Sequence, residues 1–301
     1  MRARAKRKRR IKLITYLVVV FGAGTLIFYG IYVLNQQNNA GNSLDGTAVS
    51  SADLAQLRQD SLPPYSGLGS GEQTAVKSLS GSPLLADGKP ILVFVGEEGC
   101  PYCAETRWGL VMALMRFGNF TNLSYMSSYL DGTDFPTFTF YGSTYSSPYL
   151  VFQSFELYDR VGNPLQTLPS NYSQPFSQYG GDAFPFLDFG GKAYVEGAIL
   201  PAIPSGYSDS LTYLEALFGS ENWTQVFQGI SSNNALGSIM KADTNVITAA
   251  ICNMTGNSPA SVCSQGPIVS LEGYAPSGLQ VVRAPSLSQP QLAPPQRSRR
   301  G

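Results

Sequence analysis

Two cysteines separated by two residues are the side chains of this chain best suited to chemistry. They stand in the sequence Cys100-Pro101-Tyr102-Cys103. If a helix begins here, the two sulfurs lie one turn apart and can cycle between a dithiol and a disulfide. Cys100 would then attack as a thiolate, and Cys103 would resolve the mixed disulfide.

The residues around the cysteines predict the elements that position them. Residues 91–95 (ILVFV) form an apolar run typical of a buried strand, and Gly96 and Gly99 end it. Pro101 suits the first position of a helix. One apolar face of that helix follows, made of Trp108, Val111, Met112 and Met115. Cys100 is therefore expected just before the helix, where unpaired N–H groups and the helix dipole stabilise a thiolate.

A strand, the CPYC sequence and a helix, in this order, resemble the redox centre of the thioredoxin-like fold superfamily, and glutaredoxins carry the same Pro-Tyr dipeptide. The longer string GEEGCPYCAETRW, followed by RFGNF, resembles an uncharacterised archaeal family of membrane-anchored thioredoxin-like proteins, a domain of unknown function. The resemblance implies an α/β fold, with a thioredoxin-like mixed sheet flanked by helices. It also implies thiol–disulfide exchange, but no particular substrate.

A second motif matches this resemblance further along the chain. Residues 184–195 (FPFLDFGGKAYV) read as a strand, a Gly-Gly turn and a return strand. Thioredoxin-like proteins place a cis-proline at the start of such a strand, facing the dithiol, and Pro185 matches that position. The resemblance implies that Phe184, Pro185 and Tyr102 contact the substrate. An ordinary edge-strand proline is the alternative.

The sequence also departs from the thioredoxin pattern. Thioredoxins bury an acidic residue six positions before the first cysteine, where this chain has Phe94, and they carry Trp where it has Gly99. Glu97 and Glu98 are expected on the turn rather than beneath the sulfurs. These departures favour an oxidase or isomerase over a reductant. Basic residues that would hold the carboxylates of glutathione are not evident, and no cofactor is expected.

The remaining cysteines, Cys252 and Cys263, bracket a polar loop, and we predict a structural disulfide between them. A second redox pair is the sharper alternative. The chain has no histidine, which excludes Ser/His and Cys/His catalysis. A zinc site would need all four cysteines, and Cys252 and Cys263 do not form a second CxxC, so no metal is expected. A purely structural disulfide between Cys100 and Cys103 stays open.

The N-terminus predicts a membrane anchor. Eight of the 20 basic residues lie in residues 1–12, and residues 13–34 form an uncharged apolar segment. As a helix, this segment would span about 33 Å, roughly one hydrocarbon core. The basic end is expected in the cytoplasm, which makes the chain a single-pass protein of the cell membrane with an extracytoplasmic main domain. A cleaved signal peptide is the alternative.

Beyond the anchor we expect a flexible stalk, a folded domain and a tail. Residues 35–88 are rich in Asn, Gln, Gly and Ser and would form the stalk, with one short helix at 51–59. Residues 89–265 would form the thioredoxin-like domain, with a β-rich insertion at about 130–180. Residues 266–301 would form a Pro-rich disordered tail.

Charge and sequons bear on the surroundings of this domain. Residues 13–301 carry 12 basic and 20 acidic residues, a net charge of −8, which argues against nucleic acid as a partner. Five Asn-x-Ser/Thr sequons are glycosylation candidates, although the first two are too close for both to be used: Asn119, Asn122, Asn171, Asn222 and Asn253.

We therefore predict a membrane-anchored extracytoplasmic thiol–disulfide oxidoreductase that forms or isomerises disulfides in exported proteins. Its partners would be the membrane, the thiols and disulfides of exported proteins, and a redox partner that the sequence does not identify. The alternative is a non-catalytic envelope or peptide-recognition module on a thioredoxin-like scaffold.

Overall fold

A computed structural model describes residues 44–272, apart from residues 63, 68–74, 131 and 220. The predicted anchor at 13–34 lies outside the described residues, as do residues 273–301 of the predicted tail. Within the described part of the chain, no helix has both the length and the apolar character needed to cross a bilayer.

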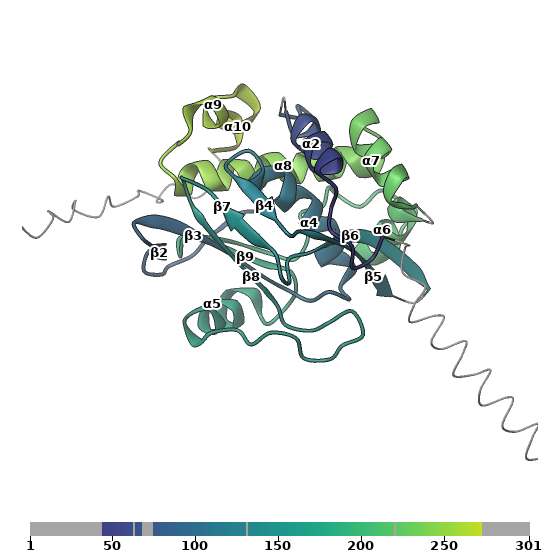
Figure 1. Cartoon of the computed structure of the whole chain (residues 1–301), viewed down its shortest axis with the longest axis horizontal. Coiled ribbons are helices and arrows are strands. Elements are labelled where there is room, and N and C mark those ends of the chain that lie inside the picture. The colour runs from purple at the N-terminus through teal and green to yellow at the C-terminus, as the bar shows by residue number, and fades with distance from the viewer. Residues whose placement is uncertain (1–43, 63, 68–74, 131, 220, 273–301) are drawn as a thin grey trace, which may run out of the picture.

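A mixed six-stranded sheet built around β3 (Lys89–Gly96) forms the centre of the molecule (Figure 1). β8 (Val151–Glu156) pairs with β3 in parallel, and β9 (Phe186–Phe189) pairs with its other edge antiparallel. β10 (Ala193–Glu196) and then β1 (Lys77–Ser78) extend the sheet beyond β9, and β2 (Leu85–Ala86) pairs with the start of β3. The parallel pair needs a crossover, which a helix provides.

Helices cover both faces of this sheet, because side chains along β3 alternate between two cores. Leu92 and Phe94 belong to the larger core, with α4 (Pro101–Leu114) and α8 (Ala235–Met254). Ile91, Val93 and Val95 belong to the smaller core, with α5 (Ser170–Gly180) on the opposite face (Figure 1). The expected α/β fold with a mixed sheet flanked by helices is therefore present.

The helix that follows the cysteines is more deeply buried than its sequence suggests. We expected α4 to bury one face, but all of its residues except Tyr102 are buried. α8 covers one side of α4, and strand β6 covers another. Gly109 permits the close approach of α8, since a Cβ there would lie 2.7 Å from Cβ of Asp243.

Two small sheets lie outside the central one. β5 (Ser124–Leu130) and β6 (Thr133–Thr139) form a hairpin, and β4 (Asn119–Thr121) pairs with β7 (Thr144–Ser146). These strands occupy residues 119–146, whereas we expected a β-rich insertion at about 130–180. β8 and α5, which fall in the predicted range, belong instead to the central layers. The sequence did not distinguish them because an inserted strand and a central strand show the same apolar alternation.

The predicted stalk is partly folded. The expected helix is present as α2 (Ser51–Asp60), capped by Ser50, and Leu57 is fully buried. β1 and β2, which also fall in the predicted stalk, join the central sheet. The boundary at residue 88 was therefore wrong, because polar composition hid the few apolar residues that dock this segment.

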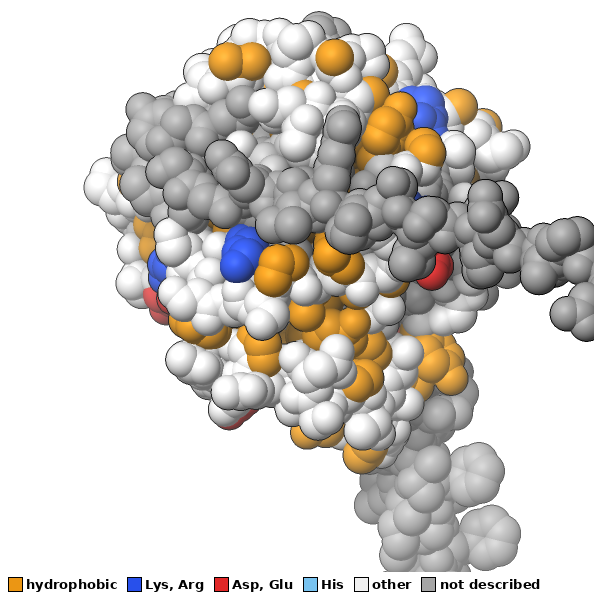
Figure 2. All heavy atoms as spheres, turned by 90° about the vertical axis from the view of Figure 1, so that its left-hand side faces the viewer, with side chains coloured by type: hydrophobic (Ala, Val, Ile, Leu, Met, Phe, Trp, Pro, Cys, Tyr) orange, Lys and Arg blue, Asp and Glu red, His pale blue; other side chains and the backbone are white. Residues whose placement is uncertain are grey.

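Five helices end the described part, in the order α6 (Ser210–Phe218), α7 (Trp223–Ser232), α8, α9 (Ala260–Cys263) and α10 (Gly266–Glu272). α10 packs on α8 and buries Ile268 and Leu271. The predicted start of the tail at Gly266 was therefore too early. Figure 2 shows a face on which basic side chains are few and scattered, in keeping with a chain that is 13% charged.

Candidate functional site

The two cysteines lie where the central strand passes into the central helix. β3 ends at Gly96, and Cys100 is the N-cap of α4, with the backbone N–H of Cys103 donating to its Sγ at 3.2 Å. Cys100 is 7% exposed and Cys103 is 0% exposed. Both are free thiols. Both residues are thus buried, and of the two only Cys100 keeps an exposed fraction.

The surroundings of the two thiols shift their pKa values in opposite directions. A hydrogen bond with the Cys103 thiol lowers the pKa of Cys100, and the positive charge of Arg107 acts in the same direction against the effect of burial. Burial raises the pKa of Cys103 well above its usual value, and the neighbouring Cys100 adds to this. The pair therefore holds its negative charge on Cys100.

The predicted proline motif lies beside the outer sulfur. The Phe184–Pro185 peptide bond is cis, and the Cys100 thiol donates to the Phe184 carbonyl at 4.0 Å. The Tyr102 hydroxyl lies 2.9 Å from Oγ of Ser210, at the start of α6. The structure thus brings Phe184 and Pro185 to Cys100, and it places the Tyr102 hydroxyl against α6.

Gly96 makes room for the inner sulfur. A Cβ at this position would lie 3.2 Å from Sγ of Cys103 and 2.5 Å from the ring of Phe94. Phe94 itself is fully buried in the larger core. An apolar ring therefore occupies the position where thioredoxins bury an acidic residue.

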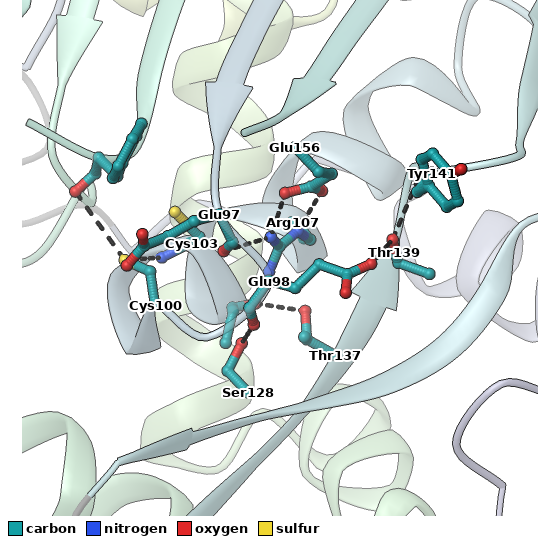
Figure 3. A network of polar contacts seen from close by, with 12 residues as sticks. Glu97, Glu98, Cys100, Cys103, Arg107, Ser128, Thr137, Thr139, Tyr141 and Glu156 are labelled. Carbon is teal, nitrogen blue, oxygen red and sulfur yellow. Dashed lines mark hydrogen bonds and ion pairs between the residues drawn. The ribbon is translucent and has the colours of Figure 1, made fainter. Parts of the chain in front are cut away.

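A buried ion pair lies next to the dithiol, and we did not predict it (Figure 3). Arg107 of α4 donates from Nε to Oε1 of Glu156 at 3.0 Å and from Nη2 to Oε2 at 2.7 Å. Nη2 also donates to the carbonyl of Glu97 at 2.8 Å. Both charged side chains are fully buried. The available signal was the position of Arg107 two helical turns after Cys100, which puts both on one face of the helix.

The turn that carries the cysteines is held from outside by the β5–β6 hairpin. Oγ of Ser128 donates to the Glu98 carbonyl at 2.5 Å, and Oγ1 of Thr139 donates to the Glu98 carboxylate at 2.6 Å (Figure 3). A Cβ at Gly99 would lie 3.0 Å from the carbonyl of Arg160, so the segment after β8 closes over this turn. Glu98 therefore lies on the turn, as expected, and works as an anchor for it.

The second cysteine pair forms the expected bond. Cys252 at the end of α8 and Cys263 in α9 are joined by a disulfide. These two sulfurs are therefore not available to a site that needs four thiolates.

The candidate sequons differ in how their asparagines are engaged. Asn222 caps α7 by accepting from the backbone of Gln225 at 3.1 Å, and Asn119 accepts from Arg58 at 2.7 Å. Asn253 has a buried Nδ2 without a hydrogen-bond partner in the described structure. The two others, Asn122 and Asn171, are exposed.

Comparison with known families gives one match. A family model described as Domain of unknown function (DUF929) matches residues 75–253. The matched range runs from β1 into the last turn of α8 and includes the dithiol, the ion pair and Pro185. No curated protein and no solved structure matches the chain.

Proposed function

The chain belongs to the DUF929 family, whose function is unknown, and we propose that this member is a thiol–disulfide oxidoreductase with a thioredoxin-like fold. Cys100 is the exchanging thiol and Cys103 resolves the mixed disulfide. The alternative, a non-catalytic recognition module, would use the same scaffold without turnover.

The arrangement of the central sheet supports the thioredoxin-like classification. β3 and β8 are parallel and are connected through α4, and β9 and β10 form an antiparallel hairpin on the other side of β3. The cis bond before Pro185 stands at the start of that hairpin. This is the order of strand, CxxC, helix and proline that the sequence resemblance implies.

One observation carries the proposal: the outer sulfur accepts a hydrogen bond at a helix N-terminus and lies beside the carbonyl that precedes Pro185. Sγ of Cys100 accepts from the backbone N–H of Cys103, and the Phe184 carbonyl is 4.0 Å away. A thiolate is the nucleophile in disulfide exchange, and donors at a helix N-terminus favour it. A substrate strand that pairs beside Pro185 would bring its own sulfur to Cys100.

The exchange proceeds in two balanced steps. A substrate thiolate attacks Sγ of Cys100 in the oxidised pair, the Cys100–Cys103 bond breaks, and Cys103 leaves and takes up a proton. A second substrate thiolate then attacks the substrate sulfur of the mixed disulfide, and Cys100 leaves as a thiolate. The substrate has lost two electrons and the pair has gained them. The reverse sequence reduces a substrate disulfide.

The sequence supports a location outside the cytoplasm. Basic residues 1–12 and the apolar segment 13–34 favour a single-pass anchor with the main domain extracytoplasmic. The Cys252–Cys263 disulfide agrees with an oxidising compartment. Exported proteins would then be the substrates, and an unidentified redox partner would restore the pair. Asn122 and Asn171 are the sequons best placed for glycosylation.

The test is exchange activity of the full chain in detergent, measured by insulin reduction and by oxidative refolding of reduced ribonuclease. We expect Cys100→Ser to abolish both reactions. Cys103→Ser should instead accumulate a substrate-linked mixed disulfide, visible on a non-reducing gel. Cys252→Ser/Cys263→Ser is the control, with folding checked by circular dichroism, and it should keep its activity. Equal activity of the wild type and Cys100→Ser would leave only the recognition module.

A further inference from the structure

We propose that Arg107, oriented by Glu156, supplies the positive charge that keeps Cys100 in its thiolate form, which makes the pair an oxidant of substrate dithiols. The inference rests on the proposed function and predicts that the exchange runs toward oxidation of the substrate. Arg107 acts here as a charge-stabilising residue, and Glu156 acts as a positioning residue.

The placement of Arg107 is fixed by contacts on three elements. Its side chain leaves α4 on the face that carries Cys100, reaches Glu156 at the end of β8, and bonds the Glu97 carbonyl on the turn. Figure 3 shows the guanidinium between Glu156 and the turn that leads to the cysteines. The group is thus held on two sides, and one of its nitrogens, Nη1, makes no hydrogen bond in the described structure.

The arginine stays charged in this buried place. Although burial lowers the pKa of Arg107, the negative charge of Glu156 and its hydrogen bonds outweigh this effect and raise the pKa above its usual value. Solvent does not screen a fully buried charge, so its influence on nearby sulfurs is stronger than at the surface. The same charge lowers the pKa of Cys100 and opposes the rise at Cys103.

Glu156 positions the guanidinium of Arg107 through two hydrogen bonds. Both of its oxygens accept from Arg107, in the bidentate geometry that fixes a guanidinium. A carboxylate that is paired in this way orients its partner. The position beneath the sulfurs that would suit a free carboxylate is filled by Phe94.

The other titratable groups near the dithiol do not replace Arg107. Glu97 and Glu98 lie on the turn, and the charge of Glu97 raises the pKa of Cys100. The apolar Phe184–Pro185 pair precedes β9, and Asp209 is fully exposed at the N-cap of α6. Arg160, on the segment that closes over the turn, is also positive, but its guanidinium pairs with Asp45 at 3.0 Å and with Asp134 at 2.9 Å. The hydrogen bonds from Cys103 and the charge of Arg107 therefore stabilise the thiolate.

The direction of the reaction follows from this charge. Stabilising the thiolate stabilises the reduced pair, which makes the disulfide form a stronger oxidant. The preferred substrates are therefore unpaired cysteine thiols in exported chains, which leave the exchange joined in a disulfide. A disulfide-bearing redox partner reoxidises the pair by the same exchange, taking up its two electrons.

The test compares three variants of the full chain in detergent: Glu156→Gln, Arg107→Gln/Glu156→Gln and, as control, Asp188→Asn. The control removes a buried carboxylate from β9 rather than from the dithiol surroundings. The reduced proteins are alkylated with iodoacetamide across a pH series, and Cys100 is followed by peptide mass spectrometry. The Cys100–Cys103 pair is also equilibrated with glutathione buffers.

We expect the alkylation midpoint of Cys100 to fall in Glu156→Gln, because the arginine charge is no longer balanced. In the double variant the midpoint should rise by about one pH unit relative to Glu156→Gln, which is about tenfold less thiolate at a fixed low pH. The glutathione equilibrium should move in parallel, with the pair less oxidising in the double variant. Asp188→Asn should keep the wild-type midpoint.

An unchanged or raised midpoint in Glu156→Gln would overturn the inference, even if the double variant does not fold. A merely structural ion pair would alter stability in both variants without moving the two midpoints in opposite directions. Failure of the proposed function looks different, because Cys100 of the folded wild type would then resist alkylation at every pH and exchange no disulfide with insulin.

Discussion

At the scale of single residues, the reactive pair depends on how two adjacent sulfurs differ. Cys100 meets a helix N-terminus and retains a small exposed area, while Cys103 is enclosed by the larger core. An exposed sulfur can meet a substrate thiol, whereas an enclosed sulfur reacts only within the molecule. In the proposed exchange, this difference in burial assigns the attack to Cys100 and the resolution to Cys103.

Gly96 is the residue whose size most directly limits this pair. Gly96→Ala would place a methyl group 3.2 Å from Sγ of Cys103 and 2.5 Å from the Phe94 ring. We expect a loss of about 1–3 kcal/mol in the free energy of unfolding, measured in urea, because the core is overpacked. Slower release of mixed disulfides should accompany it.

Gly266→Ala is the matched control for this substitution. A Cβ at Gly266 meets no atom within 4 Å. Its unfolding free energy should stay within about 0.5 kcal/mol of the wild type. If Gly96→Ala and Gly266→Ala are equally stable, the core around Cys103 accommodates the added methyl group and the prediction is wrong.

Asp188 predicts how stability depends on pH. Burial raises the pKa of its carboxyl to about 6, although Oδ1 accepts from the Gly191 N–H at 2.6 Å. In the unfolded chain this carboxyl titrates near 3.8. Between these two values the folded state binds more protons, so this group makes the protein less stable as pH rises through about 4 to 6.

Asp188→Asn should remove this dependence. Asn keeps the acceptor for Gly191 and carries no charge, so we expect stability at pH 7 to rise by at most about 3 kcal/mol. Urea unfolding at pH 4 and pH 7 measures it. If the difference between the two pH values is the same in the variant and the wild type, Asp188 does not titrate in this way.

At the scale of elements, the β5–β6 hairpin fixes the start of α4. Oγ1 of Thr137 donates to the Ala104 carbonyl at 2.7 Å, and Nε1 of Trp108 donates to the Pro136 carbonyl at 2.8 Å. With the contacts to Glu98, the hairpin therefore holds both the turn and the first two turns of the helix. Strands outside the central sheet thereby position the two cysteines.

Thr137→Val tests this role of the hairpin. The change keeps the shape of the buried side chain and leaves the hairpin without its bond to Ala104, so we expect a loss of about 1–2 kcal/mol in unfolding free energy. A slower exchange rate should accompany it. Thr144→Val on the exposed strand β7 is the control and should change neither quantity. If Thr137→Val exchanges disulfides at the wild-type rate, the bond from the hairpin to Ala104 is not needed to position the two cysteines.

At the scale of the whole molecule, the segment before the central strand is part of the folded body. α2 contacts α7, and Arg58 of α2 donates to the Gly118 carbonyl at 3.0 Å. Asp45 forms an ion pair with Arg160 at 3.0 Å, which ties this segment to the loop above the cysteine turn. Residues that read as a polar stalk thus reach the neighbourhood of the dithiol.

Leu57→Ala should show that this segment contributes to stability. Leu57 is fully buried, so we expect a loss of about 2–5 kcal/mol in the free energy of unfolding. Leu62→Ala, at a side chain that is 44% exposed, should cost much less. Chemical denaturation of the two variants measures both losses. If both losses in the free energy of unfolding are small and equal, the segment does not contribute to the folded body.

The sequence by itself determined the features that depend on neighbouring residues. The apolar run of β3, the glycine turn, the start of α4 next to Cys100 and the Gly-Gly hairpin after Pro185 all follow from local propensity and spacing. The predicted pairing of Cys252 with Cys263 spans 11 residues and matches the structure.

Only the tertiary structure decided which distant groups meet. Arg107 and Glu156 are 49 residues apart, and each reads in the sequence as a solvent-facing charge. α8 and the β5–β6 hairpin enclose α4. The spacing of apolar residues within α4 does not predict this burial on several sides. The physical reason is that periodicity records which side of an element is apolar, whereas the partner of a buried charge depends on the packing of elements brought together by the chain.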